Sequence, residues 1–443
     1  MKKSLILLLC GLLLGAAAAW AVIHFVVPRW DRSAVDNTFW QVASRLDQGG
    51  EAFAYFHAEE VGKAAMTILD SLKRNTTALP AAQQSQARQG LGMLELMLKG
   101  YGLDELSGLG FSSFAVKPGL HRVRVVLHHR PGRDKGLIWN MTGPAPRPLD
   151  ELELLPASTA LALISDYNLV KLIEWVGRIG PMMGTQGQSD APAPGADQAM
   201  AMIKAGLQAA GIDSDRLFKS YGGRLGFLLV LDPEKRVTLP AQGKSLSIPE
   251  PAFALLMRVN DNYLFDTLKA KLAALGQPKI SEEGGMRKIA FPQLPAPFPL
   301  EPAIVQKGEW LLVASRPALA DEMLGKKTPR LSASADFKAI ATKAPTLGNG
   351  FSYASPVLLR LVAQVLRENK GGLQPESALQ KITSLLDANK GLYWVVENSS
   401  QGLTYTFNHG FEISSLPALV EAFVEIAAAK AKEKAAAAVP AEE

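Results

Sequence analysis

The sequence predicts an α+β protein, in which an N-terminal transmembrane helix precedes repeated strand-helix-helix-strand-strand units that form largely antiparallel sheets with packed helices. Three observations support this class: a long uncharged apolar run at the start, a strand-then-helix pattern that returns later, and pairs of apolar strands joined by turns that contain Gly or Pro. Because 443 residues exceed one ordinary hydrophobic core, we expect two or three packed units.

The apolar run at the start predicts a membrane anchor. Residues 5–27, about 23 positions, contain no Asp, Glu, Lys or Arg, and at roughly 1.5 Å per residue they can cross a hydrocarbon layer of about 30 Å. Lys2 and Lys3 precede the run, so we expect the N-terminus in the cytoplasm and the following chain outside it. An Ala-x-Ala pattern ends at Ala21, and residues 1–30 are therefore either a retained anchor, which the longer run favours, or a cleaved signal sequence.

Cysteine use and charge limit the compartment and the partners. Cys10 is the only cysteine and lies in the apolar run, so no internal disulfide can form, which fits a bacterial envelope better than an animal secretory route. The net charge of +5 is small for this length, and no basic run with interleaved aromatic residues indicates a nucleic-acid partner. We expect a single-pass protein of the bacterial inner membrane, held through residues 5–27, with most of the chain in the periplasm or outside the cell.

An internal repeat is predicted from residues 155–176. Shifted forward by 189 positions, the segment places Leu172 on Leu361, and shifted back by 108 positions it falls more weakly on residues 53–70. Any strand followed by an amphipathic helix aligns with any other, which is the alternative for the weaker copy. However, each copy is followed by a second helical segment and two apolar strands. We therefore expect Leu172 and Leu361 at equivalent buried helix positions.

The repeat divides the remaining chain into three α+β units. They are residues 31–150, residues 151–330 with a flexible loop at 180–198, and residues 331–429, followed by an Ala/Lys/Glu tail at 430–443. The expected strands are residues 111–116, 121–128 and 136–141 in the first unit, 224–231, 252–260, 286–291, 304–306 and 310–315 in the second, and 350–354, 392–397 and 403–408 in the third.

Three short segments carry a resemblance to a known family. They are residues 155–159, which precede a strand, residues 308–315, which form a hairpin before a helix, and residues 332–337, which precede the next strand. Together they resemble a family of uncharacterised exported bacterial proteins that are grouped as a domain of unknown function. The resemblance covers residues 155–365 and implies an N-terminal membrane segment or signal and repeated strand-helix units. It implies no activity, so no residue inherits a role.

The histidines do not predict a metal site. His128 and His129 are adjacent on an expected strand, where neighbouring side chains point to opposite faces. His57, His121 and His409 lie far away in sequence. We therefore predict no metal-binding residue.

The catalytic motifs are also weak. Residues 221–226 are rich in Gly but precede a strand instead of joining a strand to a helix, and residues 325–328 lack the upstream Gly of a phosphate-binding loop. The carboxylate pairs at 59–60 and 282–283 are typical of solvated turns. We predict no catalytic or cofactor-binding residue, no cofactor and no enzymatic activity.

Three classes of function remain. The leading prediction is a membrane-tethered, extracytoplasmic, non-catalytic binding or scaffold protein of the bacterial envelope, with another envelope protein as partner. One alternative is a carrier of a hydrophobic ligand or lipid, indicated by the Met-rich segments 93–97 and 200–203, which ordinary core helices would also explain. The other alternative is a hydrolase with an unrecognised site.

Overall fold

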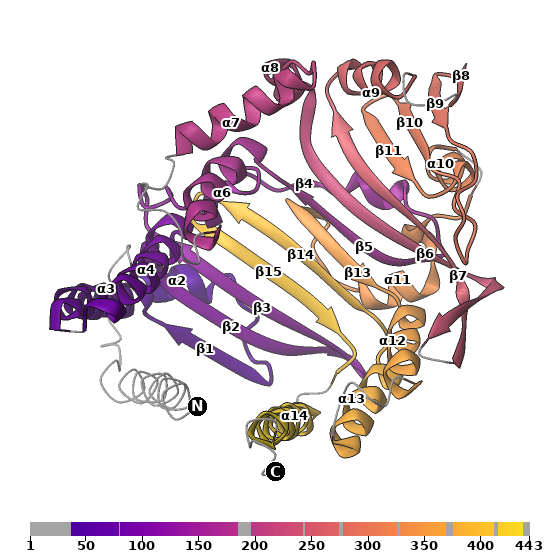
Figure 1. The fold of residues 1–443 in the computed structure, drawn as a ribbon. Coiled ribbons are helices and arrows are strands. Elements are labelled where there is room, and N and C mark those ends of the chain that lie inside the picture. The colour runs from indigo at the N-terminus through magenta and orange to yellow at the C-terminus, as the bar shows by residue number, and fades with distance from the viewer. Residues whose placement is uncertain are drawn as a thin grey trace, which may run out of the picture.

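The computed structural model describes residues 37–78, 80–184, 196–241, 244–273, 278–325, 328–368, 375–411 and 415–436. Its centre is one antiparallel sheet of 13 strands, shown in Figure 1. In order across the sheet the strands are β1 (Ala52–Phe56), β2 (Leu106–Lys117), β3 (Leu120–His129), β15 (Gly402–His409), β14 (Leu392–Ser399), β13 (Gly350–Ala354), β5 (Thr159–Asp166), β6 (Tyr221–Ala241), β7 (Lys244–Val259), β11 (Trp310–Ala314), β10 (Ala303–Lys307), β9 (Met286–Ala290) and β8 (Lys279–Glu283).

Helices surround this sheet and fill the connections between its strands. In Figure 1, α3, α4, α6 and α7 lie along one end of the central strands, and α12 and α13 lie along the other. The helices are α2 (Thr38–Ala43), α3 (Ala58–Asn75), α4 (Ala81–Glu95), α5 (Leu137–Asn140), α6 (Leu169–Gly184), α7 (Ala196–Ala209), α8 (Ser214–Ser220), α9 (Tyr263–Ala273), α10 (Pro317–Leu324), α11 (Ala335–Ile340), α12 (Pro356–Glu368), α13 (Glu376–Ala388) and α14 (Leu416–Ala436). Two short strands, β4 (Arg147–Pro148) and β12 (Leu347–Gly348), form a separate ribbon.

The predicted fold class was wrong in expecting the three units to form separate sheets. Strand, two helices and two strands do follow one another three times, as β1-α3-α4-β2-β3, β5-α6-α7-β6-β7 (with α8 before β6) and β13-α12-α13-β14-β15. Instead of forming separate sheets, the three groups of strands join edge to edge, through the pairs β3–β15 and β13–β5. The physical reason is that a three-stranded unit leaves unpaired N–H and C=O groups at its edges, and a neighbouring unit satisfies them.

The transmembrane part of the predicted class also lacks support. Among the described residues, the helices are too short or too polar to cross a membrane. The uncharged run at 5–27, the tail from residue 437 and most of the loop at 180–198 lie outside the described residues.

Two further expectations need correction. Residues 136–141 were expected to form a strand, but Leu137–Asn140 form helix α5, whose Leu137, Ile138 and Trp139 are all buried. A short apolar run without a clear period fits either element, and packing decides. Leu172 of α6 and Leu361 of α12 are each half-buried, not enclosed.

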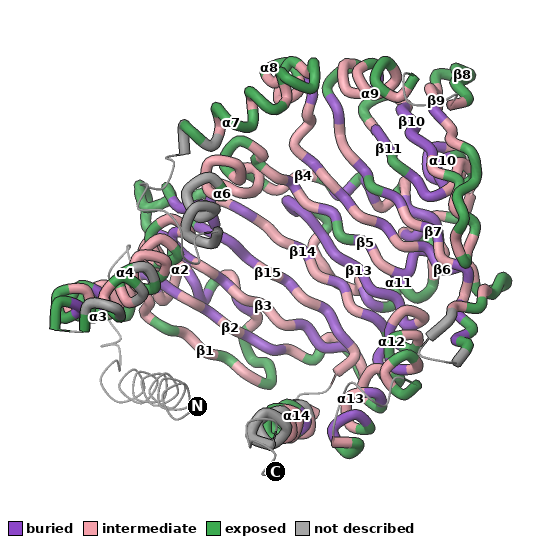
Figure 2. Tube along the Cα trace, viewed as in Figure 1, coloured by how far each residue is buried: buried purple, intermediate pink, exposed green. Residues whose placement is uncertain are grey.

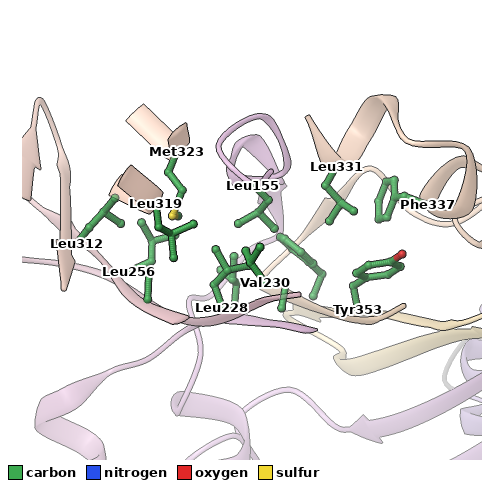
Figure 3. Packing of buried hydrophobic residues seen from close by; sticks show 14 of the residues in the cluster. Leu155, Leu228, Val230, Leu256, Leu312, Leu319, Met323, Leu331, Phe337 and Tyr353 are labelled. Atoms are coloured by element: carbon green, nitrogen blue, oxygen red, sulfur yellow. The ribbon is translucent and has the colours of Figure 1, made fainter. Parts of the chain in front are cut away.

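One face of the sheet carries the main hydrophobic core, and we call it the covered face. Alternate residues of the strands, among them Leu228, Leu256 and Tyr353, are buried there beneath α10 and α11. Figure 3 shows Met323 of α10 and Phe337 of α11 above these strand residues, together with the labelled side chains of the loops. Fully burying one such side chain is worth roughly 1.5–3 kcal/mol, so this face stabilises the fold.

Candidate functional site

The opposite side of the same strands, which we call the open face, exposes large apolar side chains. Leu163, Phe227, Leu255 and Val313 are successive register partners on β5, β6, β7 and β11, so they share one face. Leu163 and Val313 are each 40% exposed, and Leu255 is 54% exposed. Figure 2 shows the resulting alternation of buried and less buried positions along the central strands. A contiguous apolar patch of this kind indicates a binding surface.

The open face is hollowed above these residues into an apolar cavity of about 610 Å³. Its floor is formed by β5, β6, β7 and β11, and Leu169 and Leu172 of α6 form one wall. Among the described residues of its lining none is charged, and Tyr167 alone has a polar side chain. The lining residues are Leu163, Tyr167, Leu169, Leu172, Leu225, Gly226, Phe227, Leu255, Leu256, Met257, Leu311 and Val313. This volume lies in the range of about 300–1,000 Å³ that is usual for small-molecule sites.

The helices beside the cavity also expose apolar residues. On α6, Val170 is 38% exposed and Val176 is 47% exposed, and on α7 Met202 is 65% exposed. The segment 200–203 is therefore not an ordinary core helix, and in the segment 93–97 Met97 is likewise 41% exposed. Flexible, polarizable methionine side chains suit surfaces that adapt to a bound apolar group.

A second cavity, of about 460 Å³, adjoins the first at the end of β5 and the start of β6. We call it the polar cavity. It shares Tyr167 and Leu169 with the apolar cavity, but Arg147, Asp166 and several polar groups line it as well. Its lining residues are Thr142, Gly143, Pro144, Ala145, Arg147, Asp166, Tyr167, Asn168, Leu169, Val170, Phe218, Tyr221, Gly222 and Gly223.

A buried ion cluster fixes the wall of the polar cavity. Arg224, which has no exposed surface, donates from Nε to Asp166 Oδ1 at 2.8 Å and from Nη1 to Glu151. Burial alone would lower the pKa of Arg224, but its hydrogen bonds with Glu151 and Asp166 and their charges outweigh burial and raise it. Arg147 also donates to Asp166 Oδ1. Two cations and two carboxylates balance, so the cluster holds strands together without a net charge.

The adjacent histidines diverge as expected, whereas two histidines that are distant in sequence lie side by side. His128 Nδ1 lies 2.7 Å from Ser107 Oγ, whereas His129 Nδ1 lies 3.0 Å from the Arg130 carbonyl, so the adjacent pair does not converge. His121 and His409, which are distant in sequence, stack with ring centroids 5.9 Å apart.

In this stacked pair, a carboxylate oxygen of Glu51 lies 3.1 Å from His121 Nδ1. Burial lowers the pKa of His409 to about 4. Within the described ranges, groups of three or more His, Cys, Asp or Glu side chains that could hold a metal ion are absent.

Glu60, Glu282 and Glu283 are exposed, whereas the Glu59 side chain is only 12% exposed, and Glu59, Glu60 and Glu282 make ion pairs. Glu59 lies within 3.4 Å of Lys63 and 2.9 Å of Arg130 Nη2, and Glu282 lies 3.2 Å from Lys269. None of these glutamates is among the lining residues of the two cavities.

Sequence reasoning missed the residues of both cavities. The usable signal was the pair of apolar runs in β6 and β7, in which both faces of each strand are apolar although the second face is covered only in part. No family model, curated protein or solved structure matches the chain. The resemblance to exported proteins of unknown function therefore stays a prediction.

Proposed function

We propose that the protein is a non-catalytic binding protein for a hydrophobic ligand, and that the acyl chain of a lipid occupies the apolar cavity of the open face. The observation that carries the proposal is the uncharged lining of this 610 Å³ cavity, with Leu163, Leu255 and Val313 exposed on its floor. Each of the three side chains is about half exposed, so covering it would gain about half of the roughly 1.5–3 kcal/mol that full burial is worth.

The chemistry of the lining favours an acyl chain over a peptide. A peptide segment brings backbone N–H and C=O groups that need hydrogen-bond partners when they leave water. Tyr167 supplies the one polar side chain of the lining. An acyl chain needs no partner, and it can adapt to an irregular cavity whose floor contains Met257.

The proposal includes a location. The uncharged run at 5–27 and the single Cys10 are the sequence features that support attachment to the bacterial inner membrane, with the sheet on the outer side. A binding protein held there would meet lipids directly.

An envelope protein partner is the second candidate function. It is favoured by α14, where Val420, Phe423 and Val424 are 61%, 63% and 62% exposed away from either cavity lining. The first candidate ranks above it because a lined cavity of ligand size supports it.

The test compares two leucines of similar exposure in the full chain. Leu255 is 54% exposed on the cavity floor, and Leu294 is 44% exposed outside the cavity. Leu255→Glu places a carboxylate against the ligand, and we expect it to weaken binding of an uncharged solvatochromic dye such as Nile red by about tenfold or more, because a buried unpaired charge is strongly unfavourable. Leu294→Glu is the matched control and should bind as the wild type does.

A second readout identifies the natural ligand. Organic extracts of the full chain purified from membranes should contain a lipid, which Leu255→Glu loses and Leu294→Glu keeps. Equal dye binding by both variants, or an extract without lipid from the wild type, would contradict the proposal, and recovery of a stoichiometric protein in place of lipid would favour the second candidate.

A further inference from the structure

We propose that the polar cavity binds the headgroup of the same ligand, and that this headgroup carries a single negative charge on oxygen, as a carboxylate or a phosphodiester does. The inference rests on the proposed function, because it assigns the polar end of a molecule whose chain lies in the apolar cavity. It goes further in naming the class of lipid: a singly charged amphiphile.

The polar and apolar cavities adjoin each other. They share Tyr167 and Leu169, which join the end of β5 to the start of α6. Along β6, Tyr221 and Gly223 line the polar cavity, and Leu225 follows in the lining of the apolar one. A molecule with a polar end and an apolar chain could therefore contact both linings across this junction.

The polar cavity is lined by residues whose polar atoms lack well-formed hydrogen bonds. Thr142 Oγ1, Arg147 Nε and Tyr221 Oη are buried and make no well-formed hydrogen bond within the described part of the chain; Tyr221 has only a weak contact with the Tyr167 backbone. All three residues line the polar cavity. Most buried polar atoms in proteins are paired, so three without a well-formed bond at a single cavity indicate a place where water, or a ligand that displaces it, completes the bonding.

These three atoms can all act as hydrogen-bond donors. Arg147 Nε can only donate, and each hydroxyl can donate as well as accept. Burial, followed by the negative charge of Asp166, raises the pKa of Tyr221, so its hydroxyl keeps its proton at neutral pH. Three donors at one cavity match a group rich in acceptor oxygens.

The charges that line the polar cavity favour a negatively charged headgroup. Asp166 is the one carboxylate among the described lining residues; its Oδ1 accepts from Arg147 and Arg224, whose two positive charges lie beside it, and its Oδ2 has only a long contact of 3.5 Å with Asn349 Nδ2. A cationic headgroup would therefore meet Arg147 without a free counter-charge. Because Asp166 remains nearby, a single negative charge is favoured over a multiple one.

The test uses variants that remove one hydroxyl and little else. Thr142→Val and Tyr221→Phe, singly and together, remove two of the three donors, and the double variant should bind palmitate or a lysophospholipid with a phosphodiester headgroup at least tenfold more weakly, since hydrogen bonds to charged groups are the stronger ones. Nile red, which has no charged headgroup, should bind with unchanged affinity. Competition against the dye gives both dissociation constants.

The chain offers matched controls. Tyr55 Oη and Thr406 Oγ1 are also buried without a partner among the residues that the structure describes, and neither residue lines a cavity described above. Tyr55→Phe and Thr406→Val should leave all affinities unchanged, which separates a headgroup contact from a general effect of losing a buried hydroxyl. A thermal melt of each variant checks that the fold is kept.

Each outcome decides a different point. If the double variant binds palmitate and the lysophospholipid as the wild type does while Leu255→Glu still loses the dye, the headgroup inference is wrong and the proposed function stands. If the wild type binds none of the probes, the proposed function itself fails. A loss for only one of the two amphiphiles supports the inference and identifies carboxylate or phosphodiester as the natural headgroup.

Discussion

The covered and open faces of the sheet are formed by the same strands and by similar types of residue, yet the two faces differ in how far these residues are buried. On β7, Leu255 is 54% exposed and the next residue, Leu256, is 2% exposed. On β11, Val313 is 40% exposed between Leu312 and Ala314, which are buried. Residue type does not separate the two faces. What separates them is that α10 and α11 cover one face, whereas α9 covers the other only beside β9 and β10, and the apolar cavity opens next to it.

The comparison teaches that apolar composition alone does not assign a residue to the core. A leucine on the covered face stabilises the fold, whereas a leucine on the open face is available to a ligand. The two roles can be separated by experiment, because a stabilising residue changes the free energy of unfolding and a binding residue changes affinity.

The largest expected effect lies in the ion cluster on the covered side. Arg224→Ala leaves the Glu151 and Asp166 carboxylates buried without their main partner, and we expect a loss of about 3–5 kcal/mol in the free energy of unfolding. Arg258→Ala, which breaks a partly exposed pair with Glu309, should change it by about 0–1 kcal/mol. Urea unfolding measures both, and similar losses would show that burial does not distinguish the two pairs.

The next effect tests the two faces directly. Leu256→Ala should lower the free energy of unfolding by about 2–5 kcal/mol, because it removes buried methyl groups and leaves a cavity. The neighbouring Leu255→Ala should stay within about 0.5–1 kcal/mol, because its side chain is already half in water. Chemical denaturation of the two variants side by side gives the difference, and a larger loss for Leu255→Ala would invalidate the assignment of faces.

The smallest effect concerns acid pH. Burial, followed by the charge of Arg45, lowers the pKa of His128 to about 4, whereas an unfolded histidine titrates near pH 6.5. The unfolded chain therefore binds more protons between these values, and stability falls as pH drops from about 6 to about 4, by on the order of 1 kcal/mol per pH unit from this group.

The measurement is the slope of the free energy of unfolding against pH between about pH 4 and pH 6. His128→Gln should flatten that slope relative to the wild type, and His409→Gln, which removes a group with the same lowered pKa on the other side of the sheet, should flatten it similarly. Unchanged slopes in both variants would mean that these histidines titrate alike in the folded and unfolded chains.

The order of elements could be predicted from the sequence better than their pairing. Periodicity and turn residues located the segments 121–128 and 403–408, which lie within β3 and β15. They could not reveal that these two strands are register partners, with Leu127 opposite Leu403, because the period of a strand reports its faces and not its neighbour. That limit explains why separate sheets were expected where one sheet exists.

The candidate site was less predictable still. Its polar end is assembled from Thr142, Arg147 and Tyr221, which come from a loop, a two-residue strand and the start of β6. No spacing in the sequence links them. The apolar end is carried by strands whose two faces are both apolar, a pattern that usually predicts burial on both sides. Only the structure shows which side is left open.

The position of β14 and β15 in the middle of the sheet determines the order in which the protein can be completed. They are the last strands in the described part of the chain, yet they connect β1, β2 and β3 to the remaining strands. Until residues 392–409 have been synthesised, the two halves of the sheet have no strand between them, and each carries an unpaired apolar edge of the kind that promotes aggregation. Premature termination before this point would therefore divide the sheet in two instead of shortening it at an edge.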